Sequence, residues 1–160
     1  MISRSTVAAA GIAAVVTAAA PIVSQFEGMR RIPYYDVGHV LTVCFGETAG
    51  ITQRVYSIDE CNQRLSASLV SHYVAMSKCV DTTKLMLSQR VAFLSLTYNV
   101  GAGAFCASSI PKKLAAGNYS AACATISQFN QVRIGGQLVA WPGLTARRSR
   151  EREICEGRLP

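Results

Sequence analysis

The sequence predicts an α+β protein in which a small β-hairpin lobe precedes a mainly helical lobe, with a long helix joining the two. Three observations support this class. Residues 34–48 combine Tyr, Val and Thr with glycine punctuation, residues 57–76 form a long amphipathic run, and shorter helical patterns continue to residue 156. With 160 residues, of which 50% are hydrophobic, the chain can bury a substantial core.

The amino-terminal segment has the composition of a membrane segment. Residues 5–26 contain no charged side chain, and Arg4 precedes them. As a helix this run would be about 33 Å long, which is enough to cross a bilayer. The positive flank would stay in the cytoplasm and direct the rest of the chain outward.

The segment is only weakly apolar, because alanine dominates it and Pro21 lies within it. Three fates remain open on this basis: a permanent anchor, a signal peptide cleaved after the Ala18-x-Ala20 pattern, and an anchor that later leaves the membrane. We favour the last. Residues 1–23 are therefore predicted to be a membrane segment, and residues 24–160 a separate folded domain.

Within that domain the elements follow from local signals. Residues 24–31 are predicted to form a short helix that Pro33 ends, and residues 34–48 a hairpin. Ser57 and Glu60 form an S-x-x-E capping box, which predicts the start of the long helix. Further helices are expected at 86–99, 108–116, 119–129 and 144–156. These elements divide the domain into a hairpin lobe (24–56), a linking helix (57–80) and a helical lobe (81–160).

The six cysteines are even in number, and no two are closer than 17 positions. This spacing lacks the C-x-x-C pairs of zinc and redox sites, so we expect no metal and no cofactor. Up to three disulfides in an oxidising compartment are the better explanation. Their connectivity stays open on sequence grounds. The cysteines are Cys44, Cys61, Cys79, Cys106, Cys123 and Cys155.

The chain has 16 basic and 9 acidic side chains, and its net charge of +7 favours an anionic partner. The densest charge run, residues 146–158, spaces Arg147 from Glu151 and Arg152 from Glu156 by four positions. Such pairs predict a solvated helix face. Because no aromatic residues interleave with these charges, we expect no nucleic-acid binding.

Two carboxyl groups, Glu27 and Asp36, are spaced so that a short helix and a hairpin can present both to one opening. Glycoside hydrolysis needs such a pair, one as an acid for the departing oxygen and one for the other face of the sugar. The apolar neighbours of Glu27 favour a protonated acid. Thr42 is placed to hold the attacking water.

Each of these residues also has a purely structural interpretation. Ser24 and Glu27 form an S-x-x-E capping box, so Glu27 could merely cap a helix that starts there. Asp36 could be a turn residue beside Gly38, and Thr42 an ordinary β-branched strand residue. The spacing alone does not choose between structure and catalysis.

A resemblance favours catalysis. The run E-G-M-R-R-I-P-Y-Y-D from Glu27, followed by Thr42, resembles the E-G-x-R-x-x-x-Y-x-D…T signature of phage-type lysozymes, glycoside hydrolase family 24. The similarity continues through QRVAFLSLTYNVGAGAFCASSI and ends with the P-G-L-x-x-R-R-x-x-E stretch from Pro142 to Glu151. The sequence departs from the pattern at Gly38, where the glycine comes one residue early, and at Glu47, where relatives commonly have His.

The resemblance implies a lysozyme-like fold and a monomeric muramidase that cleaves the β-1,4 bond between N-acetylmuramic acid and N-acetylglucosamine in peptidoglycan, thereby lysing the host cell. It implies Glu27 as proton donor, Asp36 as its carboxylate partner and Thr42 as a catalytic helper. Tyr98 and Ser108 match positions that line the sugar groove.

The weakly apolar amino terminus is similar to that of signal-anchor-release phage endolysins. This implies an enzyme held first at the periplasmic side of the host inner membrane and later released into the periplasm. No cysteine lies in residues 1–26, so release would proceed by refolding of the segment and not by disulfide exchange.

Two other function classes compete with this hypothesis. A cysteine-dependent cell-wall amidase or peptidase would need Cys44 as nucleophile with His39 as base. A non-catalytic wall-binding module would need no acid at all, although all three catalytic positions are filled.

Overall fold

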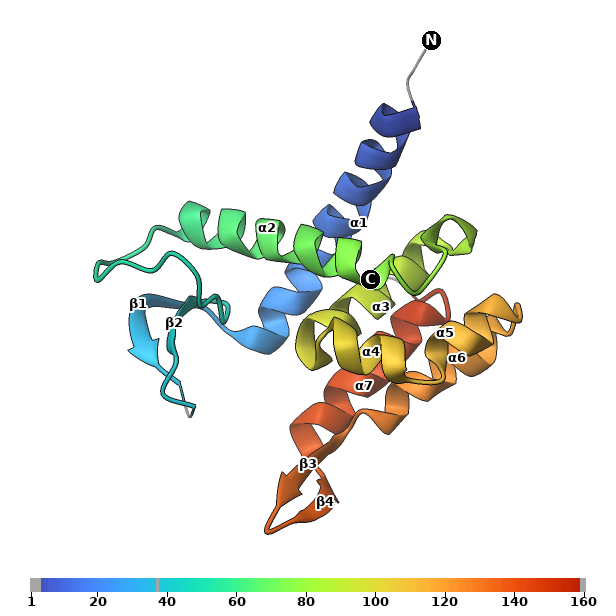
Figure 1. Cartoon of the computed structure of the whole chain (residues 1–160). Helices are drawn as coiled ribbons and strands as arrows, with labels where there is room; N and C mark the ends of the chain where they lie inside the picture. The colour runs from blue at the N-terminus through green and yellow to red at the C-terminus, as the bar shows by residue number, and fades with distance from the viewer. Residues whose placement is uncertain (1–3, 37, 159–160) are drawn as a thin grey trace. The chain divides into compact units, whose positions relative to one another are not determined.

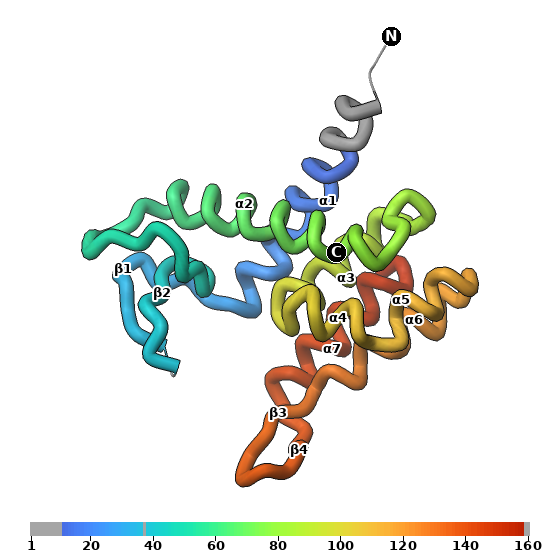
Figure 2. The backbone as a smooth tube through the Cα atoms, viewed as in Figure 1, coloured from blue at the N-terminus to red at the C-terminus, as the bar shows by residue number. Residues whose placement is uncertain are grey.

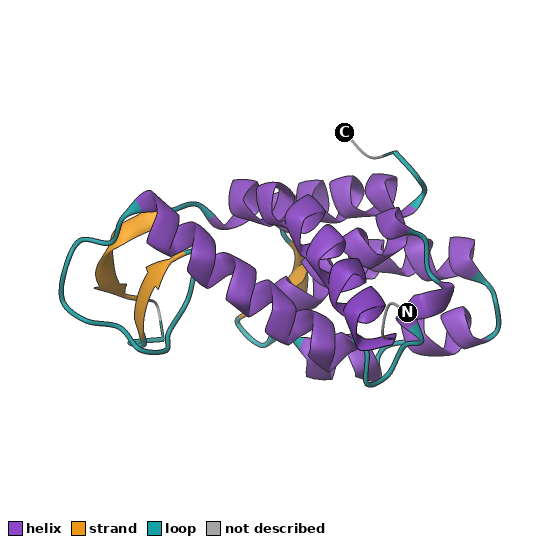
Figure 3. Ribbon diagram, turned by 90° about the horizontal axis from the view of Figure 1, so that it is seen from above, coloured by secondary structure: helices purple, strands orange, loops and turns teal. Residues whose placement is uncertain are grey.

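The computed structural model describes residues 4–36 and 38–158 (Figure 1). It confirms the predicted α+β class: helices dominate, and two small antiparallel hairpins accompany them (Figure 3). The chain divides into two compact units, Met1–Ser71 and His72–Pro160.

Among the described residues, no helix is both long enough and apolar enough to cross a membrane.

The first unit begins with α1, a single helix from Arg4 to Glu27. The predicted separate helix over 24–31 is therefore wrong: residues 24–27 are the last turn of α1. Gly28 ends the helix because it adopts a left-handed φ of 68°, while its N–H donates to the Ser24 carbonyl at 3.2 Å. Pro33, the expected stop, lies inside the following strand.

From residue 11 to residue 27, buried positions of α1 alternate with exposed ones. The buried residues recur at the spacing of a helical stripe and are mostly β-branched. They are Val15, Val16, Ala19, Ile22 and Val23. The exposed residues between them are small or weakly apolar, namely Ala13, Ala14, Thr17 and Pro21.

The predicted hairpin is present, but it begins at Arg30 and ends at Cys44, four residues earlier than the expected range of 34–48. Strand β1 (Arg30–Tyr35) pairs antiparallel with β2 (Leu41–Cys44), and the register shifts between Arg30 and Tyr34. Pro33 is tolerated because a two-stranded ribbon leaves one edge of each strand unpaired.

Helix α2 (Ile58–Met76) begins with the predicted capping box. The Ser57 N–H donates to Glu60 Oε2 at 2.7 Å, and the Glu60 N–H donates to Ser57 Oγ at 3.1 Å. Arg54 bonds the same carboxylate and, together with Ser57, lowers the pKa of Glu60 to about 2. The disulfide Cys44–Cys61 ties β2 to this helix.

The second unit is mainly helical and confirms the helices expected at 86–99, 108–116, 119–129 and 144–156. Its central helix, α3, is buried on most sides, as expected for a core helix. The disulfides Cys79–Cys106 and Cys123–Cys155 complete the set of three. The elements are η1 (Thr82–Lys84), α3 (Leu87–Val100), α4 (Ala102–Ala107), α5 (Ile110–Ala115), α6 (Tyr119–Thr125), η2 (Ile126–Gln128) and α7 (Pro142–Cys155).

This unit also contains a second hairpin, which the sequence patterns considered above did not predict. Strand β3 (Gln131–Ile134) pairs with β4 (Gln137–Ala140) around Gly135 and Gly136. Both glycines have positive φ, 55° and 85°, as a tight two-residue hairpin turn requires. Figure 2 shows this hairpin extending beyond the start of α7.

A buried ion cluster joins α7 to α3, and it shows that the expected solvated face is wrong for Arg147 and Glu151, whereas Arg152 and Glu156 form the expected exposed pair. Ser95 Oγ donates to Glu151 Oε1 at 2.7 Å, and Arg147 Nε lies 3.1 Å from the same oxygen. Arg148 Nε lies 3.0 Å from Glu151 Oε2, and its Nη2 donates to Asn99 Oδ1. Burial raises the pKa of the Glu151 carboxyl, against the opposing effect of both guanidinium groups and Ser95.

We expect Glu151→Gln to lower the free energy of unfolding by about 3–5 kcal/mol, because it leaves two guanidinium groups buried without their carboxylate. Urea denaturation measures this change. The matched control is Glu153→Gln. Glu153 pairs with Arg150, and their side chains are 40% and 41% exposed, so this pair should contribute less than about 1 kcal/mol to the free energy of unfolding. Equal effects of the two substitutions would contradict the structural role of the cluster.

We expect the double substitution Cys44→Ala/Cys61→Ala to lower the free energy of unfolding by about 3 kcal/mol, because the bond closes a loop across a separation of 17 residues. The effect should be concentrated in the first hairpin. Hydrogen exchange at the Val43 amide, which bonds the Glu47 carbonyl at 2.9 Å, reports on it. The comparison is Cys123→Ala/Cys155→Ala. Faster hydrogen exchange at Val43 in that variant than in Cys44→Ala/Cys61→Ala would refute the expectation.

Candidate active site

The mouth of the first hairpin fixes the orientation of Asp36. Its Oδ1 accepts hydrogen bonds from the Gly38 N–H at 2.8 Å and from the Val40 N–H at 2.9 Å. The Asp36 N–H donates to the Val40 carbonyl at 3.0 Å. Asp36 is therefore the turn residue that one interpretation expected, and the same bonds hold its carboxylate in one position, as a catalytic carboxylate requires.

Thr42 is joined to Asp36 through Val40. The Thr42 hydroxyl donates to the Val40 carbonyl at 2.9 Å, and this is the oxygen that accepts from the Asp36 N–H. The Thr42 side chain is only 3% exposed. Because its hydrogen is already donated, Thr42 Oγ1 can act toward a water molecule only as an acceptor. The structure thus brings Asp36 and Thr42 into one network.

Sequence reasoning missed Val40 because its contribution is made entirely by its backbone. The position of Gly38, by contrast, has a visible reason. A Cβ added there would lie 3.3 Å from Asp36 Oδ1, which is tighter than an ordinary contact. A glycine two residues after Asp36 therefore lets the backbone approach the carboxylate.

Glu47, the second departure from the family pattern, closes the turn after β2. Its Oε2 accepts from the Phe45 N–H at 2.8 Å, and its backbone exchanges hydrogen bonds with Val43. This turn lies next to the disulfide at Cys44. The substitution has a local structural role and leaves Asp36 and Thr42 in place.

Glu27 is the last residue of α1, and its side chain is half-buried. The capping-box hypothesis for Glu27 is wrong because the helix does not begin at Ser24, whose hydroxyl donates instead to the Pro21 carbonyl at 2.9 Å. A carboxylate is also disfavoured at the carboxyl end of a helix by the helix dipole. Helix stability therefore gives no reason for an acid at this position.

The chain between the two carboxyl groups is short and held by local contacts. Gly28 turns it out of α1, and β1 begins two residues later, at Arg30. The Arg30 guanidinium lies over the Tyr34 ring, 4.4 Å from its centroid. Two residues of the family signature thus support β1 itself, and Glu27, Asp36 and Thr42 all belong to the first unit.

The two predicted sugar-groove residues lie in the second unit. Tyr98, on α3, is half-buried, with its ring centroid 5.0 Å from that of His72. Ser108 ends α4; its hydroxyl donates to the Phe105 carbonyl at 2.7 Å and accepts from the Ile110 N–H at 3.2 Å. These bonds give Ser108 a local role in the turn between α4 and α5, while sugar binding by either residue remains a prediction.

Two other possible sites are separate from these residues. Cys44 is bonded to Cys61, so it has no thiol with which to act as the nucleophile of a peptidase or amidase. Within the described part of the chain, no three His, Cys, Asp or Glu side chains gather as metal ligands would.

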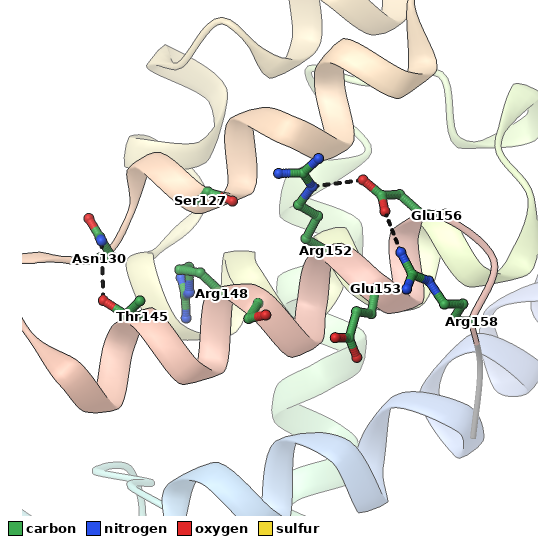
Figure 4. A pocket seen from close by; sticks show the side chains of 9 residues that line it. Ser127, Asn130, Thr145, Arg148, Arg152, Glu153, Glu156 and Arg158 are labelled. Carbon is green, nitrogen blue, oxygen red and sulfur yellow. Dashed lines mark hydrogen bonds and ion pairs between the residues drawn. The ribbon is translucent and has the colours of Figure 1, made fainter.

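A polar pocket of about 390 Å³ lies along α7 (Figure 4). Its charged side chains are largely paired: Glu156 accepts from Arg152 and Arg158, and Arg150 holds Glu153. None of the five predicted site residues lines it. The lining residues are Ser127, Asn130, Thr145, Arg148, Ser149, Arg152, Glu153, Glu156 and Arg158.

Comparison with known proteins places the chain in a family. Residues 24–151 match the family model described as Phage lysozyme. The SAR-endolysin of Enterobacteria phage P21 is 37% identical over 133 residues, which cover 81% of this chain and 76% of that relative.

Two solved structures share the fold. The endolysin from Escherichia coli O157:H7 phage FAHEc1 has a TM-score of 0.77 at 23% identity, covering 88% of this chain and 91% of that one. The muramidase domain of SpmX from Asticaccaulis excentricus has a TM-score of 0.79 at 21% identity, covering 97% of both chains. From the extent of the family match and the identity to its relatives, the chain belongs to the phage lysozyme family.

Proposed function

We propose that this protein is a muramidase-type endolysin that hydrolyses the β-1,4 bond between N-acetylmuramic acid and N-acetylglucosamine in peptidoglycan and so lyses the host cell. The observation that carries the proposal is the hairpin network. It holds the Asp36 carboxylate on two backbone N–H groups and links it through Val40 to Thr42, just after the helix that ends in Glu27. The match to the phage lysozyme family and the names of its relatives support the same chemistry.

In the proposed reaction, Glu27 donates its proton to the glycosidic oxygen as the bond from that oxygen to the anomeric carbon breaks. Asp36, ionised, acts on the opposite face of the sugar. Thr42 accepts a hydrogen bond from the attacking water and helps to orient it. Water supplies the hydroxyl group of the new reducing end and releases one proton to solvent, from which Glu27 is reprotonated. The chemistry requires no cofactor.

We expect Glu27→Gln to abolish clearing of purified murein, because an amide cannot donate the proton that the leaving oxygen needs. Loss of turbidity measures the rate, and a fall of at least about a hundredfold is expected for removal of a general acid. Asp59→Asn removes a carboxyl group in the same unit, at the start of α2, and should retain activity. Clearing by Glu27→Gln at the native rate would refute the assignment.

We also propose that residues 1–23 first hold the enzyme in the host inner membrane, facing the periplasm, and later leave it. The SAR-endolysin names of the relatives support this route. The two faces of α1 support it physically. Between residues 11 and 23 its buried positions are mostly β-branched, whereas its exposed positions carry Ala, Thr and Pro, which are acceptable both in water and in lipid.

The segment cannot lie in lipid and in the folded protein at the same time. While Val15, Ala19 and Val23 lie in lipid, they are absent from the buried positions that they occupy in the folded protein. Glu27 belongs to the same helix and lies four residues after Val23. It therefore cannot take its final position until that stripe is buried. Release of the segment and assembly of the active site are thus one event in this proposal.

We expect the triple substitution Ala13→Leu, Ala14→Leu and Thr17→Leu to delay release. Each leucine favours the bilayer by about 0.6 kcal/mol, and the three positions are exposed in the folded protein, so the fold should tolerate them. Membrane fractionation should show more protein retained and later lysis. Serine at the same three positions is the control and should speed release. Unchanged partition of the leucine variant would count against a releasable anchor.

A further inference from the structure

One face of the β3–β4 hairpin is an uncharged apolar stripe. Cross-strand pairing of Val132 with Val139 and of Ile134 with Gln137 places these residues on the same side, by the alternation of strand side chains. Trp141 follows Val139 by two positions and continues the stripe. Ile134, Val139 and Trp141 are each between 42% and 51% exposed.

Trp141 is held firmly in spite of its exposure. Its backbone N–H donates to the Asn130 carbonyl at 2.8 Å, and its backbone carbonyl accepts from the Thr145 N–H at 2.9 Å. These two bonds fix the junction between β4 and α7. Pro142 follows and restricts the backbone further. The indole lies beside Gly143, where an added Cβ would be 3.6 Å from Cδ1. An indole on a fixed stretch of backbone loses less conformational entropy when a ligand covers it than one in a mobile loop.

The ends of the stripe are polar but uncharged. Gln137 shares the face by register and brings a planar amide group to one end, while the Asn130 amide at the other end donates to Thr145 Oγ1 at 3.2 Å. The single arginine of the hairpin, Arg133, lies on the opposite face beside Leu138, and its guanidinium donates to the Gly136 carbonyl at 2.6 Å. A surface for anionic lipid would instead surround its apolar residues with lysine and arginine.

We propose that this face binds the glycan strand of peptidoglycan, with Trp141 stacked on a sugar ring. The apolar C–H face of a pyranose fits an indole, and the N-acetyl methyl groups of both sugars fit the Val and Ile side chains beside it. The Gln137 amide suits hydroxyl and acetamido groups. The inference rests on the proposed function for the identity of the polymer, and it assigns a binding role that the predicted catalytic residues do not provide.

Charge agrees with this partner. Residues 1–71 contain five basic and five acidic side chains, whereas residues 72–160 contain eleven basic and four acidic ones. The whole net charge of +7 therefore belongs to the unit that carries the hairpin. Peptidoglycan bears carboxylates on its stem peptides, so the unit attracts it over a distance while the uncharged stripe makes the close contact.

Kinetics of the full chain test the proposal. We expect Trp141→Ala to raise the murein concentration for half-maximal clearing by about tenfold, with little change in the rate at saturation, since stacking contributes to binding and not to bond cleavage. Trp141→Tyr should restore most of the affinity. Leu138→Ala, on the opposite face and 59% exposed, is the matched control and should stay within about twofold.

Fluorescence gives a second readout, because Trp141 is the one tryptophan of the chain. With Glu27→Gln to prevent hydrolysis, soluble murein glycan strands should shift or quench its emission. A shift with phosphatidylglycerol vesicles and none with glycan would overturn the proposal in favour of a lipid surface. Native clearing by Trp141→Ala, or equal losses in Trp141→Ala and Leu138→Ala, would also overturn it. If the native protein fails to clear murein while the glycan still shifts the emission, the proposed function fails and the binding surface stands.

Discussion

The continuity of α1 is the constraint on which the proposed site depends. The helix runs without a break from Arg4 to Glu27, although Pro21 removes one backbone donor within it. Gly28 then ends it one residue after the predicted acid. The rigid geometry of a helix therefore transmits the placement of the buried stripe directly to the carboxyl group at its end. If the link between the buried stripe and Glu27 were flexible, the carboxyl group could move independently of the stripe.

The other predicted catalytic residues depend on backbone groups more than on side chains. Two N–H groups hold Asp36, and one carbonyl serves both Asp36 and Thr42. A two-stranded hairpin is marginally stable by itself, so this network needs external support. The Cys44–Cys61 disulfide supports strand β2. Strand β1 is supported by Arg31, whose Nε donates to the Tyr56 carbonyl at 2.7 Å.

The sequence predicted those features whose cause is local. The Ser57–Glu60 capping box and the predicted helices of the second unit appear where short-range patterns indicated them, and the first hairpin appears four residues earlier than indicated. The second hairpin has an equally local signal, the Gly135-Gly136 pair between two stretches of alternating residues. For Asp36 and Thr42, the residue types and spacing could be read directly, but the Val40 link could not, because a backbone group has no signature in the sequence.

The remaining errors have one physical origin: the same short pattern can serve different environments. Ser24 and Glu27 have the spacing of a helix start, yet they lie at a helix end, where Gly28 and not Pro33 decides the boundary. Arg147 and Glu151 have the spacing of a solvated pair, yet they are buried against α3. Only tertiary packing distinguishes these cases, and packing is not encoded within a window of a few residues.

The uneven distribution of charge has a consequence for how the protein moves once it is at work. Between Asp81 and Glu151 the chain contains no acidic residue. A unit with so one-sided a charge dissociates slowly from a polyanion and diffuses along it, as basic proteins do on nucleic acid, and screening by salt shortens its residence. An enzyme of this kind would make successive cuts in the same sacculus and would remain with the debris of its own host instead of spreading to neighbouring cells.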